Sequence, residues 1–168
     1  MGSPAREALA IRRGEYGVAS AILTEAANWL SQSGRQLWPS EEVSEDALRR
    51  RSAPNSVLTG YWRSIPVVTT LLEWRDDMFW PGIDDAGFIH RLAVRRAAAG
   101  QGHAQAMLEW AANEAASRGK ECLRLDCVAT RTRLCAFYER CGFERVGSWT
   151  QAAHYEQALY RRPVASRG

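Results

Sequence analysis

The feature that most constrains this chain is a predicted strand that runs through a glycine turn directly into a helix, at residues 92–104. The segment reads LAVRRAAAGQGHA. Glycine tolerates positive φ angles and lets a ligand approach the backbone closely. The first N–H groups of a helix have no partner within the helix, and the helix dipole adds positive potential there. The segment therefore predicts either a tight strand-to-helix turn or a binding site for a phosphate group.

Hydrophobic periodicity predicts the element order β-α-α-β-β-β-α-β-α-β-β, which a mixed sheet with helices on both faces accommodates. Apolar stripes predict the long helices, and Ser44 is expected to cap the second helix. Arg63 and Ser64 are expected to form the turn of an antiparallel hairpin. The helices are expected near residues 19–30, 44–51, 104–115 and 134–141, and the strands near 9–11, 56–62, 67–72, 88–94, 123–127, 143–149 and 154–160.

Two common phosphate-binding motifs do not fit the glycine turn. The three-glycine spacing of the dinucleotide fingerprint is absent, and no Gly-Lys-Ser/Thr is present for a P-loop. The turn resembles motif A of the GCN5-related N-acetyltransferases, whose loop reads Gln/Arg-x-x-Gly-x-Gly/Ala. Gly102 and Ala104 fill its last two positions and Gly100 supports the turn. Ala99 stands where that family has Gln or Arg.

A second motif of the same family follows in the C-terminal half. Residues 136–143 read AFYERCGF and are similar to its Tyr-x-x-x-Gly-Phe signature. Both motifs occur in the expected order, and the resemblance is strong from about Phe88 to Gly147. It implies an α/β fold, a single domain with a mixed central β-sheet and helices on both faces. It also implies N-acetyltransferase activity with acetyl-CoA as the acyl donor.

The resemblance further implies which residues bind acetyl-CoA. The strand end and the turn would hold acetyl-CoA mainly through backbone N–H groups. Ala99 lacks the family's Gln or Arg side chain but still has its backbone N–H, and Arg95 or Arg96 would add positive charge. Arg131 stands at the edge of the cofactor groove, where the family commonly has Asn. The residues expected to bind the cofactor are Leu92, Ala93, Val94, Ala99, Gly100, Gln101, Gly102, His103, Ala104, Gln105, Arg131 and Phe137.

Acetyl transfer to an amine requires a base for the amine, polarisation of the thioester carbonyl, and stabilisation of the leaving thiolate. The resemblance implies that Tyr138 protonates the thiolate, because a phenol keeps its proton at neutral pH. The apolar stripe of its helix would equally make Tyr138 a core residue. His90, four residues before Val94, titrates near neutral pH and is the expected base. A strand histidine that pairs with an acid is the alternative interpretation.

The expected acceptor is the primary amine of a small molecule. Tryptophans beside acidic residues suit a cationic group, and the acids could also replace His90 as the base. Transfer to a peptide or protein amine, and a non-catalytic CoA-binding regulatory module, are the alternatives. Asp126 is assigned no chemistry and is expected to pair with Arg124 or Arg133, and His103 is expected to face solvent. The residues expected at the acceptor are Trp38, Glu73, Trp74, Asp76, Asp77 and Trp80.

Composition adds few constraints. The 168 residues suit one domain, expected at residues 6–162, with flexible termini at 1–5 and 163–168. A net charge of +3 is too small to indicate a nucleic-acid partner. No apolar run approaches the roughly 20 residues that span a bilayer, so a cytoplasmic location and no membrane partner are expected. The protein is expected to be a monomer or a homodimer. Four cysteines and three histidines without zinc-ligand spacing predict reduced thiols and no metal site.

Overall fold

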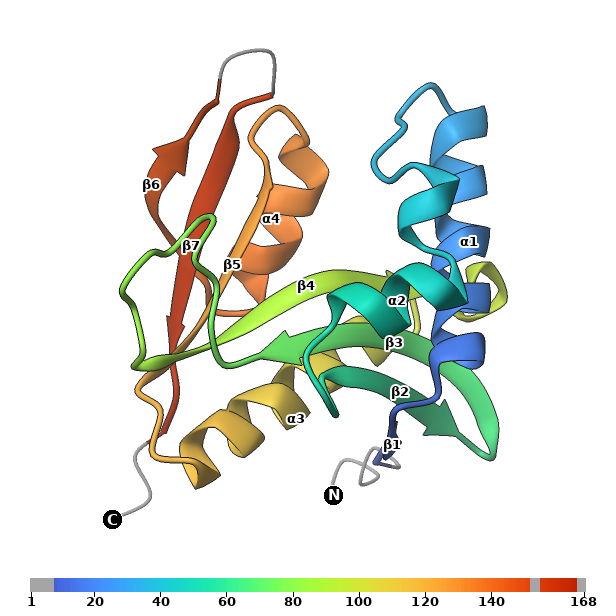
Figure 1. Ribbon diagram of the computed structural model, residues 1–168, viewed down its shortest axis with the longest axis horizontal. Coiled ribbons are helices and arrows are strands. Elements are labelled where there is room, and N and C mark those ends of the chain that lie inside the picture. The colour runs from blue at the N-terminus through green and yellow to red at the C-terminus, as the bar shows by residue number, and fades with distance from the viewer. Residues whose placement is uncertain (1–7, 152–154, 166–168) are drawn as a thin grey trace, which may run out of the picture. The chain divides into compact units, whose positions relative to one another are not determined.

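The computed structural model describes residues 8–151 and 155–165 (Figure 1). Its helices and strands occur in the predicted order, with two short 3-10 helices in addition. β7 begins at Gln157, and the expected start at His154 lies outside the described residues. Within the described ranges, no helix is long and apolar enough to cross a membrane. The elements are β1 (Ala10–Arg13), α1 (Tyr16–Gln32), η1 (Ser40–Glu42), α2 (Glu45–Arg51), β2 (Val57–Trp62), β3 (Ile65–Glu73), β4 (Ala86–Val94), η2 (Arg96–Ala98), α3 (His103–Ser117), β5 (Cys122–Val128), α4 (Thr132–Arg140), β6 (Glu144–Trp149) and β7 (Gln157–Pro163).

The strands form a mixed seven-stranded sheet in the order β1-β2-β3-β4-β5-β7-β6. β4 and β5 pair in parallel, and the pairs β1–β2, β2–β3, β5–β7 and β6–β7 are antiparallel. A parallel pair needs a crossover connection, and α3 supplies it. The chain divides into two compact units, described separately below. Unit 1 contains the residues up to Leu71 with Arg91–Met107, and unit 2 contains Leu72–His90 with the residues from Leu108 onward.

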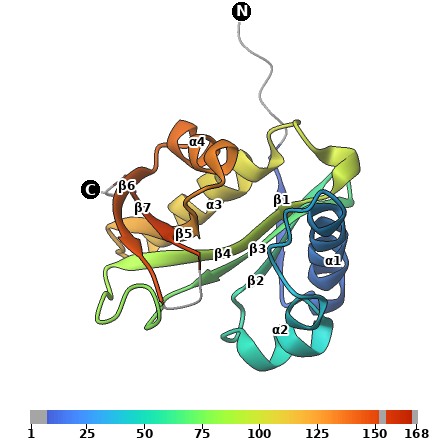
Figure 2. The same ribbon diagram turned by 90° about the horizontal axis from the view of Figure 1, so that it is seen from above.

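Unit 1 carries helices on both faces of its strands. The apolar stripe of α1, with Ile22 and Leu23 fully buried, packs in one core cluster with Val57 of β2. Gly60 faces the opposite way, and a side chain there would meet Met107 of α3. α1 and α2 lie side by side on one side of β2 and β3 (Figure 2). Ser44 caps α2 as predicted, since its Oγ accepts a hydrogen bond from the Ala47 N–H at 3.2 Å.

The hairpin of unit 1 turns at the predicted position. Arg63 and Ser64 have φ angles of 49° and 65°, and the flanking residues Trp62 and Ile65 are paired across the two strands. Positive φ at both central residues is the conformation of a type I′ turn, whose twist matches that of the strands it joins. The turn is formed here without the Gly or Asn that usually occupies it.

Unit 2 contains β5, β7 and β6 side by side, with α4 along them (Figure 1). Side chains alternate between the two faces of β4 and β5, and the parallel register matches Phe88 with Arg124. We call the side of Ala86, Phe88, Cys122 and Arg124 the even face, and the side of Gly87 and Leu123 the odd face. Trp80 packs with Ala86, Phe88 and Cys122, so the loop at residues 74–85 covers the even face.

Candidate active site

Three acidic side chains gather around His90 in unit 2. His90 Nε2 lies 3.5 Å from Asp76 Oδ2 and 3.9 Å from Glu73 Oε2. One carboxylate oxygen of Asp76, one ring nitrogen of His90 and one carboxylate oxygen of Asp126 lie within 4.8 Å of one another. Glu73 ends β3 and Asp76 follows in the next loop, whereas His90 and Asp126 continue the even face of β4 and β5. Acceptor atoms that converge in this way suit a positively charged group.

Asp76 is oriented by its own loop. Its Oδ1 accepts hydrogen bonds from the backbone N–H groups of Met78 and Phe79, at 3.0 and 3.1 Å. The side chain is 6% exposed, and its Oδ2 accepts no hydrogen bond from the described part of the chain. An unsatisfied buried oxygen is unfavourable in a folded protein and calls for an explanation. Asp76 therefore uses one oxygen to order the loop and presents the other to the cluster.

Asp126 is the residue of this cluster that sequence analysis missed. Burial raises the pKa of its carboxyl to about 6, while His90 lowers that pKa and Asp76 raises it. The expected partner Arg124 instead lies 3.9 Å from an oxygen of Asp85. The signal was the alternation of β5: Asp126 follows Arg124 by two residues, so it shares the face of His90 once β4 and β5 are known to be parallel neighbours.

The three predicted tryptophans have packing roles. Trp38 packs against the core cluster of unit 1. Trp74 lies against Gly87 on the odd face, with the Arg118 guanidinium 4.5 Å from its ring centroid, and so faces away from His90. Trp80 is 7% exposed within the core of unit 2, and Arg124 stacks on its ring at 4.7 Å. Large apolar side chains are used here for cores, which local sequence does not distinguish from pocket walls.

Two other residues of the loop differ in their environment. Asp77 is exposed and pairs with Arg75 at 2.6 Å, so it is a solvated charge and not part of the cluster. Phe79 contacts Trp149 in an edge-to-face arrangement, with ring centroids 4.8 Å apart. The register of β6 and β7 matches Trp149 with the residue two positions after Asp126 on β5. This aromatic pair therefore lies on the even face.

Tyr138 approaches from the other side of the strands. It is 7% exposed and its ring packs against Phe137, Phe143 and Tyr160, with centroid distances of 5.3, 5.8 and 6.4 Å. Tyr160 belongs to the odd face through its register with β5. Burial raises the pKa of Tyr138 above its ordinary value of 10.0, so the phenol keeps its proton. The packing of Tyr138 fits a core residue, and its retained proton fits an acid. His90 lies on the opposite face of the strands.

The predicted phosphate loop lies in unit 1. Gly100 and Gly102 have φ angles of 74° and 85°, a conformation that glycine adopts without strain. The Ala106 N–H donates the first helical bond to Gly102 O at 3.0 Å, so the N–H groups of His103–Gln105 precede the helical ladder. A side chain at Gly100 would meet nothing within 4 Å, so the turn is open on that side. These donors at the positive end of a 15-residue helix suit a pyrophosphate.

The structure corrects two expectations for this loop. The Ala99 N–H donates to Arg96 O at 3.2 Å, so it belongs to the local turn and is not available to a ligand. His103 does not face solvent: it is 6% exposed, its ring centroid lies 5.8 Å from that of Trp62, and burial lowers its pKa. It occupies the position four residues before buried Met107, which extends the apolar stripe of α3 backwards by one turn.

β4 contains an irregular residue, Arg91, which has a φ angle of 53°. A non-glycine residue with positive φ within a strand is uncommon, and such strain concentrates at functional sites. The Arg91 guanidinium holds this conformation by donating to the Glu42 backbone oxygen and lying 3.5 Å from its carboxylate. Arg91 directly precedes Leu92–Val94, which are among the residues expected to bind the cofactor.

The arginines that sequence analysis expected at the cofactor divide between structural and exposed positions. Arg95 donates from Nε to Pro66 O at 2.9 Å, which ties the end of β4 to the hairpin. Arg96 is exposed and its guanidinium lies 3.7 Å from the Trp29 ring centroid, so it keeps its charge beside the loop. Arg131 immediately precedes α4, and its backbone oxygen accepts hydrogen bonds from the first turn of that helix.

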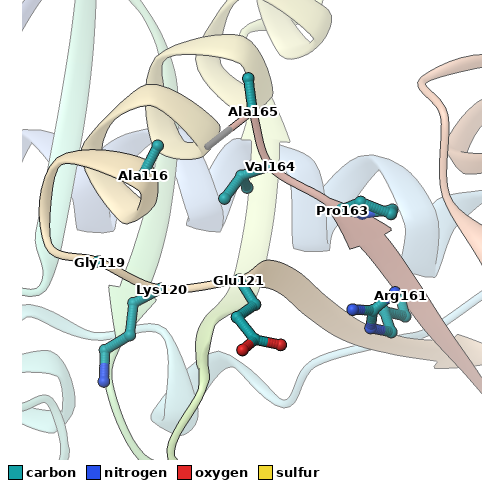
Figure 3. A pocket seen from close by; sticks show the side chains of 8 residues that line it. All are labelled: Ala116, Gly119, Lys120, Glu121, Arg161, Pro163, Val164 and Ala165. Atoms are coloured by element: carbon teal, nitrogen blue, oxygen red, sulfur yellow. The ribbon is translucent and has the colours of Figure 1, made fainter. Parts of the chain in front are cut away.

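A hollow of about 440 Å³ lies elsewhere in unit 2, where α3 leads into β5 beside the end of β7 (Figure 3). It contains none of the predicted site residues. Lys120 on its rim donates from Nζ to Asp84 O at 2.6 Å, so this cation helps to anchor the loop before β4. Its lining residues are Ala116, Gly119, Lys120, Glu121, Arg161, Pro163, Val164 and Ala165.

Sequence comparisons show which known proteins this chain is similar to. The profile of the family described as "Acetyltransferase (GNAT) family" matches residues 23–143. The chain is 31% identical over 145 residues to YesJ of Bacillus subtilis (strain 168), described as an uncharacterized N-acetyltransferase, and the match covers 79% of this chain and 78% of that protein.

Solved structures share the fold at lower identity. A GNAT-family acetyltransferase from Listeria monocytogenes has a TM-score of 0.73 at 19% identity, covering 93% of this chain and 95% of that chain. A ribosomal-protein-alanine N-acetyltransferase from Brucella melitensis has a TM-score of 0.66 at 17% identity, covering 93% of this chain and 100% of that chain.

The raised pKa of Asp126 predicts a measurable pH dependence of stability. Its folded-state pKa of about 6 exceeds the ordinary 3.8, so the folded protein binds the extra proton and its stability falls as pH rises between these values. Asp126→Asn removes this titration and should gain roughly 2 kcal/mol over wild type between pH 3.5 and pH 7. Urea unfolding across that range measures the gain, with exposed Asp84→Asn as the control. Parallel curves for wild type and Asp126→Asn would contradict the prediction.

Proposed function

The chain belongs to the acetyltransferase (GNAT) family, and we propose that it transfers an acetyl group from acetyl-CoA to the primary amine of a small molecule. The observation that carries the proposal is the cluster of His90 with Glu73, Asp76 and Asp126 on the even face. It combines an imidazole, which can accept a proton, with carboxylates that favour a cation. An amine acceptor needs both, because it arrives as an alkylammonium ion and reacts only after losing a proton.

The glycine loop of unit 1 fits the donor. Acetyl-CoA, when bound, supplies the acetyl group as an activated thioester. The N–H groups of His103–Gln105 would hold its pyrophosphate, because they have no helical acceptor and lie at the positive end of α3. The positive φ angles of Gly100 and Gly102 support this by leaving the turn free of side chains, and exposed Arg96 adds charge.

The residues of the chain divide the proton transfers between them. His90 accepts a proton from the ammonium group, and the carboxylates of Asp76 and Glu73 stabilise the imidazolium that forms. Backbone N–H groups of Leu92–Val94 would donate to the oxygen on which negative charge develops. Tyr138 holds a proton on Oη that it can give to the departing sulfur. Base and acid then act from opposite faces of β4 and β5, so neither blocks the other.

Thiol release from acetyl-CoA across an acceptor panel tests the proposal. The panel contains benzylamine, 1,4-diaminobutane, glucosamine and a short peptide with an N-terminal alanine. At least one small amine should be acetylated with a kcat/KM about tenfold or more above that of the peptide, and His90→Gln should lower it. Faster acetylation of the peptide would contradict the small-molecule assignment, and the absence of thiol release with every acceptor of the panel would indicate a non-catalytic CoA-binding module.

The donor site gives a prediction that does not depend on the acceptor. Acetyl-CoA should raise the Tm of the wild-type protein, because a ligand that binds only the folded state stabilises it. Ala104→Glu places a carboxylate at the helix N-terminus, which suits the helix dipole but repels a pyrophosphate. The shift should therefore be lost while the Tm without ligand is retained. Asn113→Asp, an exposed position on α3, is the control of equal charge. An unchanged shift in Ala104→Glu would place the phosphates elsewhere.

Tyr138→Phe tests the acid. The substitution keeps the ring contacts and removes only the hydroxyl, so turnover should fall about 10²-fold with little change in Tm. Tyr160→Phe is a matched control, because it removes the hydroxyl of a neighbouring buried tyrosine whose Oη donates to Glu139 at 3.0 Å. Steady-state kinetics with the best amine of the panel measures both variants. If Tyr138→Phe is as active as Tyr160→Phe, Tyr138 is a core residue only.

A further inference from the structure

We propose that Asp76, His90 and Asp126 form a three-point acceptor site for the ammonium group of the acetyl acceptor, and that the three acceptors together select a primary ammonium. This inference rests on the proposed function and adds the atoms that recognise the substrate. The assignment concerns the charged head group alone, whatever molecule carries it.

The first step is the orphaned oxygen of Asp76. Its side chain is only 6% exposed, and the backbone N–H groups of its own loop donate hydrogen bonds to Oδ1 alone. Oδ2 accepts no hydrogen bond from any described residue and points to His90 Nε2 at 3.5 Å. That separation is longer than a normal hydrogen bond, so Oδ2 has no close donor among the described residues. A donor that reaches both would satisfy the buried oxygen.

The second step is the spacing of the three acceptors. A primary ammonium donates three hydrogen bonds. The acceptor atoms of Asp76, His90 and Asp126 lie within 4.8 Å of one another, so a single nitrogen between them can lie within about 3 Å of all three. Each N-methyl group would replace one N–H by carbon against a buried acceptor, which costs a hydrogen bond to a charged group. The site therefore favours a primary ammonium over its methylated analogues.

The third step is charge. Asp126 is largely buried, and burial is the main reason that its carboxyl resists ionisation. The groups that face it are Asp76 from the loop and His90 from β4, with Glu73 of β3 beside His90 at 3.9 Å. Ionisation of Asp126, with its pKa of about 6, adds a negative charge to this set. A substrate cation restores the balance, so binding should strengthen as pH rises through that value.

The proton transfer that follows is balanced within the site. An ammonium N–H bond breaks and an N–H bond forms at His90 Nε2, whose neutral ring carries its other proton on Nδ1. The electron pair stays on the substrate nitrogen, which becomes the nucleophile. Asp76 remains paired with the imidazolium, and Asp126 exchanges no proton in the step. Asp126 thus acts on substrate affinity, and His90 acts on turnover.

The binding test uses methylammonium chloride as the probe and needs no acetyl transfer. The Cε1–H signal of His90 is followed by NMR at constant ionic strength, and His90→Gln assigns it among three histidines. Wild type should show a saturable shift with methylammonium and none with tetramethylammonium. Asp126→Asn should weaken binding about tenfold or more, because one charged hydrogen bond is lost, and exposed Asp84→Asn should not. Asp76→Asn is a second variant with the same expectation.

The kinetic test uses the best amine of the acceptor panel. Asp126→Asn should raise the KM for that amine about tenfold or more while kcat and the KM for acetyl-CoA change little. Equal NMR shifts with tetramethylammonium, unchanged binding in Asp126→Asn, or displacement of methylammonium by micromolar Zn²⁺ would each overturn the inference. Methylammonium binding as predicted, without acetylation of any amine, would instead contradict the proposed function and leave the ammonium site intact.

Discussion

The parallel register of β4 and β5 is the constraint on which the candidate site depends. It matches Phe88 with Arg124, and the alternation of strand side chains then gives His90 and Asp126 a common face two residues further on. A shift of one residue would move Asp126 to the side of α4 and bring Cys127 to the side of His90. The chemistry proposed for His90 follows from this pairing, because neither strand contains the cluster alone.

Burial gives the cluster its character. A carboxylate near an imidazole at the surface would be screened by water and would matter little. Asp76 and Asp126 are held away from water, one by two backbone N–H groups of its own loop and the other within β5. Buried carboxyl groups reduce the stability of a fold. Because stability alone does not favour them, clusters that contain a group with a shifted pKa are typical of functional sites. The same loop covers the even face through Trp80, so core packing positions the acid.

The opposite faces of β4 and β5 differ in chemical character. The even face carries charge, with His90 among acids, and the odd face carries the neutral phenol of Tyr138 among aromatic rings. In the proposed reaction these two groups act on different atoms, His90 on the acceptor nitrogen and Tyr138 on the departing sulfur. The strained residue Arg91 follows His90 on β4 and ends the regular alternation there.

The sequence by itself determined the elements and the two local motifs. Apolar periodicity located α1 and α3, a capping serine located α2, and Gly100 and Gly102 located the loop before α3, because each of these depends on neighbours within a few residues. It did not place Trp74, Trp80, His103 or Asp126 correctly, since an aromatic or charged residue has the same local signal in a core, a pocket or a surface. Only the tertiary structure decided that Glu73, Asp76, His90 and Asp126 converge. Contacts between residues so far apart in the chain depend on strand register and loop path, which short-range preferences do not encode.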